Sequence, residues 1–279
     1  MMCTPTTIAL ENVNGVSRPM PFPGSYVIED DPIVAMLVAE AEADEDVIGL
    51  ILMGSRSVRL VDLESDYDAY FVVTDEAMAH YDKSSLPPRG HTVQPPINTE
   101  DLFTMALSGF YRENLPTWTL PTWADAYVLY DRDGAVTKVI DALRLMPEDE
   151  SSVQVSEWYD TYLNSLYRSL KCWRRGNALG GRLEAVESID ALLHTLYALE
   201  RRWRPYSSRL VVHLHELDGQ GWAKDELRTL LLSLAATGDP AVQQHIAQRV
   251  TALLGDRGFD HILQEWHGQI EQALSWSFV

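Results

Sequence analysis

The sequence contains few cysteines and no membrane-length apolar segment. Its two cysteines, Cys3 and Cys172, are far apart among 279 residues, so neither a disulfide framework nor a cysteine metal cluster is expected. No apolar stretch reaches the length that spans a bilayer, and the N-terminus lacks the basic and apolar regions of a signal peptide. These absences predict a cytoplasmic protein with no membrane partner.

Positive charge is also scarce. The chain has 22 lysines and arginines against 41 aspartates and glutamates, a formal net charge of −19. This excess repels the phosphates of nucleic acid and attracts small polycations. No Walker-type phosphate loop or Ser-His-Asp signature is present. We therefore expect neither a P-loop enzyme nor a nucleic-acid partner.

The most informative feature is a glycine-serine pair after an apolar run. Residues 47–53 are apolar and rich in β-branched side chains, a composition typical of a buried strand. The run ends at Gly54 and Ser55. Glycine allows a sharp turn and a close approach to phosphate, and serine can cap a following helix. This Gly-Ser turn is a candidate cradle for a triphosphate.

Two carboxylates follow after a gap of ten residues. Asp66 and Asp68 open a second apolar run that ends at Val73, and residues two apart on a strand share a face. Neighbouring carboxylates repel each other unless a divalent cation lies between them. Mg²⁺ that is bound to a nucleotide fits, since it takes one or two carboxylates together with phosphate oxygens.

Gly54, Ser55, Asp66 and Asp68 resemble the signature of the nucleotidyltransferase superfamily related to DNA polymerase β, and the match covers about residues 47–74. With its helical second half, the chain looks most like the aminoglycoside adenylyltransferases, enzymes of antibiotic resistance. The resemblance implies that Asp66 and Asp68 hold Mg²⁺ on ATP and that Gly54 and Ser55 cradle its terminal phosphates. A hydroxyl of a small cationic acceptor then takes AMP, and pyrophosphate leaves.

The superfamily usually carries a third metal carboxylate on a neighbouring strand. Residues 91–97, ahead of a helix expected to start near residue 99, are the first place to look and contain no acid; His91 and Gln94 would be weaker substitutes. Asp125, which opens the apolar run 124–130, is the other candidate, or else a solvated aspartate at a strand end.

A turn signal closes this part of the chain. Asp131 and Asp133 precede Gly134, a pattern typical of a turn, and we assign both acids to structure. Helices are expected over residues 32–43 and 135–145. A segment with a proline, an acidic cluster and serines, residues 146–152, then marks a domain boundary.

Beyond that boundary the pattern is helical throughout. The fold class predicted is α/β in the α+β sense: a mixed-sheet nucleotidyltransferase domain, residues 1–150, followed by a helical bundle domain, residues 151–279. The expected helices span residues 153–175, 182–203, 222–236, 241–254 and 259–276. The apolar face of the second of them is assigned to Leu183, Val186, Leu193, Leu196 and Tyr197.

Three polar groups of the second half have a structural and a functional interpretation. Four basic residues lie in the last turns of a predicted helix, where they either stabilise the helix dipole or bind the triphosphate: Arg168, Lys171, Arg174 and Arg175. The acids Glu184, Glu187 and Asp190 form a solvated stripe, or else supply a general base and counter-charges for a cationic substrate. Arg209 ends a basic and aromatic segment, as a helix-end residue or as a nucleotide ligand.

Adenylyl transfer from Mg-ATP to a small cationic acceptor is the leading hypothesis. One rival is an adenylyltransferase that modifies a protein partner, which predicts a stable complex and no small-molecule turnover. The other is a nucleotide-binding protein without activity, which follows from the absent third acid.

Overall fold

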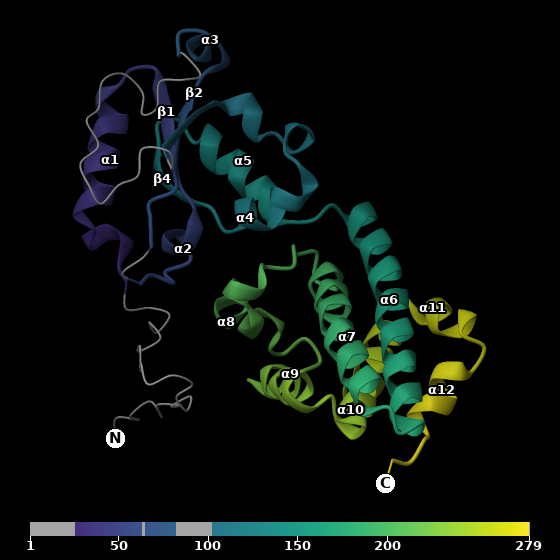
Figure 1. The fold of residues 1–279 in the computed structure, drawn as a ribbon. Helices are drawn as coiled ribbons and strands as arrows, with labels where there is room; N and C mark the ends of the chain where they lie inside the picture. Colours follow the sequence, from purple (N-terminus) through teal and green to yellow (C-terminus); the bar gives the residue numbers. More distant parts are fainter. Residues whose placement is uncertain (1–25, 63–64, 82–101, 279) are drawn as a thin grey trace, which may run out of the picture.

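The computed structural model describes residues 26–62, 65–81 and 102–278. A four-stranded sheet with flanking helices is followed by a helical bundle (Figure 1), which confirms the predicted α+β class. The strands are β1 (Val47–Leu52), β2 (Ala69–Val73), β3 (Leu102–Ala106) and β4 (Tyr127–Asp131). The helices of the first half are α1 (Pro32–Ala43), α2 (Gly54–Ser57), α3 (Asp75–Met78), α4 (Leu120–Ala124) and α5 (Ala135–Arg144).

The sheet has the strand order β3-β2-β1-β4. β1 is antiparallel to both β2 and β4, whereas β2 and β3 are parallel, so the sheet is mixed. The end of β1 lies between two strand starts, because Leu52 pairs with Ala69 on one side and with Tyr127 on the other. The Gly-Ser turn and the segments before β2 and β4 therefore meet at one edge of the sheet.

Both faces of β1 are buried, which explains its unbroken apolar sequence. Leu50 and Leu52 pack in a cluster with α1, and Ile51 packs in a second cluster with α4 and α5. Figure 1 shows α1 on one side of the sheet and α5 on the other. This two-sided packing holds the end of β1, and with it the Gly-Ser turn, in a fixed position.

The second half is a bundle around one apolar cluster. Its two long helices, α6 and α7, pack along each other, and Tyr159, Tyr162 and Tyr197 are fully buried between the elements. The helices are α6 (Glu148–Arg174), α7 (Ala178–Leu199), α8 (Leu210–His213), α9 (Glu226–Thr237), α10 (Pro240–Asp256), α11 (Asp260–Glu265) and α12 (Gln269–Leu274).

The segment after α7 joins the bundle to the sheet domain. Trp203 packs against the apolar clusters of both halves, and its indole N–H donates to the backbone oxygen of Leu143 at 2.8 Å. Met146 and Arg201 are joined by a backbone hydrogen bond of 2.8 Å. A tryptophan shared between two cores resists sliding of one half over the other.

Several predicted elements are confirmed and three need correction. The predicted helix 32–43 matches α1, and the prediction for 135–145 matches α5 to within one residue. β2 begins at Ala69 rather than at residue 66. Residues 102–106, expected to belong to a helix, form the edge strand β3, because their apolar side chains pair with β2. The last predicted helix, 259–276, is broken at Gly268, where φ is +78°.

The long helices also differ from their predicted limits. α6 begins at Glu148, so most of the segment assigned to a domain boundary is the first turn of that helix. α7 ends at Leu199, six residues before Pro205. Leu183 and Val186 were assigned to its buried face and are instead 59% and 47% exposed. Helical spacing placed them on one stripe, but α6 and α9 cover a different side of α7.

Candidate functional site

The Gly-Ser turn and the second acid of the Asp-x-Asp segment are in contact. Gly54 has a φ of +72°, and a Cβ atom at this position would overlap Oδ2 of Asp68. The backbone N–H of Met53 donates to the carbonyl oxygen of Asp68 at 2.8 Å, which fixes the two segments together. Only glycine satisfies both the dihedral angle and the space. The predicted juxtaposition of turn and carboxylate is present.

Ser55 carries a polar group without a partner. Its Oγ is buried and has no hydrogen-bond partner in the described part of the chain. The neighbouring hydroxyl of Ser57 donates instead to the carbonyl oxygen of Gly54 at 3.0 Å. Buried hydroxyls are normally hydrogen-bonded, so the unpaired hydroxyl of Ser55 is a donor that a bound ligand would satisfy.

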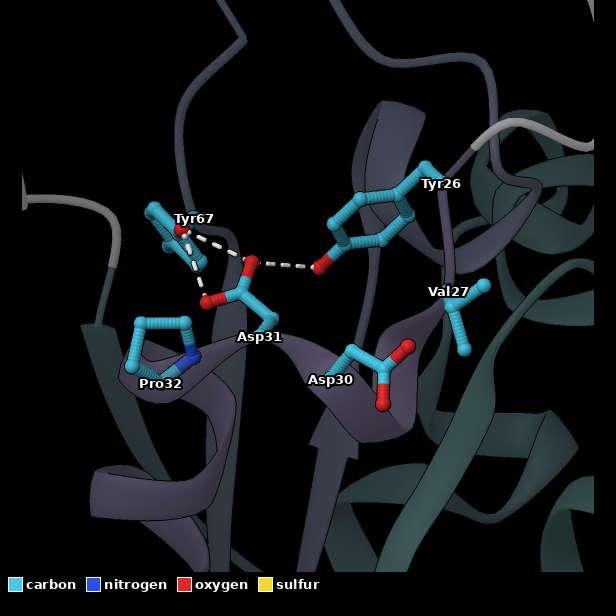
Figure 2. A pocket seen from close by; sticks show the side chains of 6 residues that line it. All are labelled: Tyr26, Val27, Asp30, Asp31, Pro32 and Tyr67. Carbon is cyan, nitrogen blue, oxygen red and sulfur yellow. Dashed lines mark hydrogen bonds between the residues drawn. The ribbon is translucent and has the colours of Figure 1, made fainter.

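Asp66 and Asp68 precede β2 instead of lying on it. Asp66 is exposed, Tyr67 is buried and Asp68 is partly buried, an alternation that an extended chain produces. The argument from a shared strand face therefore needs correction, but the outcome is similar: Tyr67 points into the protein, and the two acids flank it. The hydroxyl of Tyr67 lies 2.9 Å from Oδ2 of Asp31 (Figure 2), on the inner side of this segment.

Asp125, the candidate third acid, is joined to Arg209, the candidate nucleotide ligand. Nη1 of Arg209 donates to Oδ2 of Asp125 at 2.8 Å. Nε2 of His213 lies 3.0 Å from Oδ1 of Asp125, close enough for an ion pair although it makes no well-aligned hydrogen bond. The exposed fractions of these side chains are 7%, 12% and 15%. Asp125 thus binds two cationic groups from the bundle.

Two more charged residues complete this cluster. Nδ1 of His213 lies 3.2 Å from Oε1 of Glu216, and Arg202 pairs with the other oxygen of Glu216 at 2.7 Å. Burial lowers the pKa of His213, but its interactions with Asp125 and Glu216 outweigh burial and raise that pKa to about 9. His213 is therefore cationic at neutral pH. α8, which carries it, lies on the side of the bundle that faces α4 (Figure 1).

The predicted acidic stripe is partly paired. Asp190 forms an ion pair with Arg204 at 2.7 Å. Glu184 lies 3.8 Å from Arg168, one of the four basic residues at the end of α6. Arg174 is placed over the ring of Trp276 at 4.0 Å. These contacts are ones that a helical bundle makes within itself, so they supply the structural interpretation of both groups.

Asp131 and Asp133 have the structural role that their turn pattern predicts. Asp131 accepts backbone hydrogen bonds from Gly134 and Thr137, and Asp133 accepts one from Ala135. Burial raises the pKa of Asp131, but these hydrogen bonds lower it below its ordinary value overall. Both acids hold the start of α5.

Some of the predicted site lies outside the described residues. This applies to His91, Gln94 and the whole segment 91–97. Within the described ranges, no three His, Cys, Asp or Glu side chains gather to form a metal site.

Sequence reasoning missed three residues of this region: Arg56, Asp31 and His213. Arg56 directly follows the Gly-Ser turn and is only 8% exposed, and Asp31 is 7% exposed. An arginine beside a phosphate-binding turn, and an aspartate before a Pro-started helix, were the available signals. No sequence signal tied His213 to Asp125.

Comparison with known proteins finds one matching family and a solved structure of low similarity. Residues 113–209 match a family described as a domain of unknown function, DUF4037. No curated protein matches. A solved nucleotidyltransferase-like protein from Exiguobacterium sibiricum is similar at 15% identity with a TM-score of 0.36, over 86% of this chain and 76% of that one.

Among the described helices, none combines the length and the apolar character that crossing a bilayer requires.

Proposed function

We propose that this protein is a magnesium-dependent nucleotidyltransferase that moves AMP from ATP to a hydroxyl of a small cationic acceptor of the aminoglycoside type. The observation that carries the proposal is the contact between Gly54 and Asp68: a carboxylate oxygen of Asp68 occupies the space that the Cβ of any other residue at position 54 would need. A turn that must be glycine and that faces an acid brings a phosphate-binding backbone next to a cation ligand.

The residues at this site fit a magnesium ion that is bound to a nucleotide. Asp66 and Asp68 would hold Mg²⁺, and the unpaired hydroxyl of Ser55 would donate to a phosphate oxygen. Mg²⁺ on a nucleotide neutralises phosphate charge and polarises the phosphoryl group for attack. The backbone at Gly54 can approach the phosphates closely because no side chain intervenes.

Arg209 and Asp125 have distinct proposed roles. A guanidinium has five N–H donors in a planar fork, and Asp125 uses Nη1 of Arg209. Within the described residues its other donors make no hydrogen bond, and we assign them to a phosphate at the same edge of the sheet. Asp125 then acts by holding Arg209 and His213 against the sheet domain, which differs from the metal-binding role that the resemblance implied.

The acceptor class rests on charge. The net charge of −19 favours a cationic small molecule over nucleic acid or another anion. Acidic groups on the bundle, such as the exposed Glu187, supply counter-charges without needing a dedicated pair.

One observation favours a second function, nucleotide binding without transfer. Asp125 is occupied by two cations, so the described residues offer Asp66 and Asp68 as the only acids beside the Gly-Ser turn. Two carboxylates suffice to bind one Mg²⁺ with its nucleotide. Some transfer reactions use two metal ions, and two carboxylates would bind the second ion only weakly.

A pyrophosphate-release assay tests the proposal. The protein is incubated with Mg-ATP and each member of an aminoglycoside panel, and adenylylated product is sought by mass spectrometry. Release that depends on one acceptor supports transfer to a small molecule. ATP binding without pyrophosphate release with any acceptor points to a non-catalytic protein or to a protein acceptor. Incubation with radiolabelled ATP and a cell lysate distinguishes these two, because only a protein acceptor becomes labelled.

A further inference from the structure

A buried ion pair lies against the backbone that leads into the Asp-x-Asp segment. Nη1 of Arg56 is 3.2 Å from Oδ2 of Asp31, and both side chains are almost fully buried. Burying two charges costs desolvation, which a chain tolerates when every polar group of the pair is hydrogen-bonded. The other contacts of the pair therefore indicate what it is for.

Arg56 uses each nitrogen of its guanidinium. Nε donates to the backbone oxygen of Asp66 at 2.8 Å, and Nη2 donates to the backbone oxygen of Ser65 at 3.0 Å. Nη1 faces Asp31. The fork thus holds two consecutive carbonyls of the segment that carries the first acid, a geometry that a single ammonium group cannot reproduce.

Tyr67 closes the arrangement. The Cζ atom of Arg56 lies 3.6 Å from the centre of the Tyr67 ring, so the guanidinium stacks on the residue between the two acids. The hydroxyl of Tyr67 donates to Asp31, as does the hydroxyl of Tyr26 at 2.7 Å (Figure 2). Asp31 also accepts the backbone N–H of Ile33 at the start of α1.

These contacts leave Asp31 ionised. Burial raises its pKa, but hydrogen bonds from Tyr26, Tyr67 and the start of α1 lower the pKa below its ordinary value overall. Burial and the same carboxylate raise the pKa of Tyr67 to about 12, so this hydroxyl keeps its proton and remains a donor. The anchor is a carboxylate with fixed donors on several sides.

The geometry points to Arg56 as a positioning residue: anchored by Asp31 and Tyr67, it sets the backbone at Ser65 and Asp66, and thereby directs Asp66 and Asp68 to the Gly-Ser turn. Arg56 is one residue from Ser55, so a single side chain links the phosphate-facing turn to the acids opposite it. This inference rests on the proposed nucleotide site and names the residue that assembles it.

Arg56→Lys is the informative variant because it keeps the charge and loses the fork. Binding of a non-hydrolysable ATP analogue is measured calorimetrically in Mg²⁺ and again in EDTA. The expected result is a fall of about tenfold or more in affinity with Mg²⁺, and little change in EDTA. Arg59→Lys, at an exposed arginine three residues away, is the matched control and should bind like the wild type.

Tyr67→Phe keeps the ring under Arg56 and removes only the hydroxyl, so it provides a second variant if Arg56→Lys does not fold. We expect it to lose metal-dependent affinity by a smaller factor. Addition of millimolar guanidinium to Arg56→Ala should restore part of that affinity, which a general loss of stability would not allow.

The outcomes separate the two proposals. Wild-type protein that binds the analogue no better with Mg²⁺ than in EDTA overturns the proposed function and this inference together. Wild-type binding that depends on Mg²⁺ and is unchanged in Arg56→Lys and Tyr67→Phe overturns the inference alone. A folded variant that loses affinity equally in Mg²⁺ and in EDTA also overturns it, because positioning of the acids acts through the metal.

Discussion

Asp125 and Arg209, which are 84 residues apart in the sequence, are joined by a hydrogen bond of 2.8 Å between the sheet domain and the bundle. His213 contacts the other oxygen of the same carboxylate. One buried acid therefore ties two cations of the second half to the edge of the sheet where the Gly-Ser turn lies. The arrangement of the two halves depends on this charge cluster as well as on Trp203.

Removal of Asp125 should destabilise the protein strongly. Asp125→Ala leaves Arg209 buried without its counter-charge and leaves His213 with Glu216 as its remaining carboxylate, and an uncompensated buried charge costs about 3–5 kcal/mol. Urea unfolding measures this loss. Glu187→Gln, at an exposed acid of α7, is the control and should change the free energy of unfolding by about 0.5 kcal/mol at most. Equal stability of Asp125→Ala and wild type would show that the cluster adds nothing.

Stability should fall as pH rises through the titration of His213. The pKa of this residue is raised in the folded protein to about 9 from an ordinary value of 6.5. The folded state therefore binds the proton more tightly, and the stabilisation is complete below pH 6.5 and is lost between 6.5 and about 9. The charged groups packed around it are Asp125, Glu216, Arg202 and Arg209.

Unfolding free energies at several pH values across this window test the prediction. His213→Gln should flatten the profile there, whereas His245→Gln, at a half-exposed histidine, should leave it unchanged. A wild-type profile that matches that of His213→Gln would mean that His213 is not held as a cation.

Position 54 in the Gly-Ser turn should tolerate no side chain. Gly54→Ala introduces a Cβ at a φ of +72° and against Asp68. Gly134→Ala is a matched control, since Gly134 has a φ of +83° with nothing within 4 Å of the added atom. Both changes should cost about 1–2 kcal/mol of backbone strain. Only Gly54→Ala should also lose Mg-ATP binding; equal binding losses in the two variants would remove Gly54 from the site.

Local patterns of the sequence predict the central strand β1 and the turn that ends it. The apolar run of β1 and its end at Gly54 follow from two-sided burial and from a positive φ, both of which leave local signals. The contact of Gly54 with Asp68 was predictable because β1 and β2 are neighbours in sequence and pair antiparallel.

Contacts between distant segments were not predictable in the same way. The pairing of Asp125 with Arg209 and His213 depends on how the bundle docks, and no periodicity encodes that. The exposure of Leu183 and Val186 likewise depends on which side of α7 its neighbours cover. The burial of Arg56 needed its partner Asp31, which lies 25 residues earlier in the chain.

The most direct test of the account is a calorimetric titration of ATP, with and without Mg²⁺, into the wild type, Asp66→Asn and Asp68→Asn. These substitutions keep the size of each side chain and remove the charge that holds the cation. The account predicts Mg²⁺-dependent binding in the wild type and its loss in both variants, with unchanged folding by circular dichroism. Mg-ATP affinity that is the same in all three proteins would contradict it.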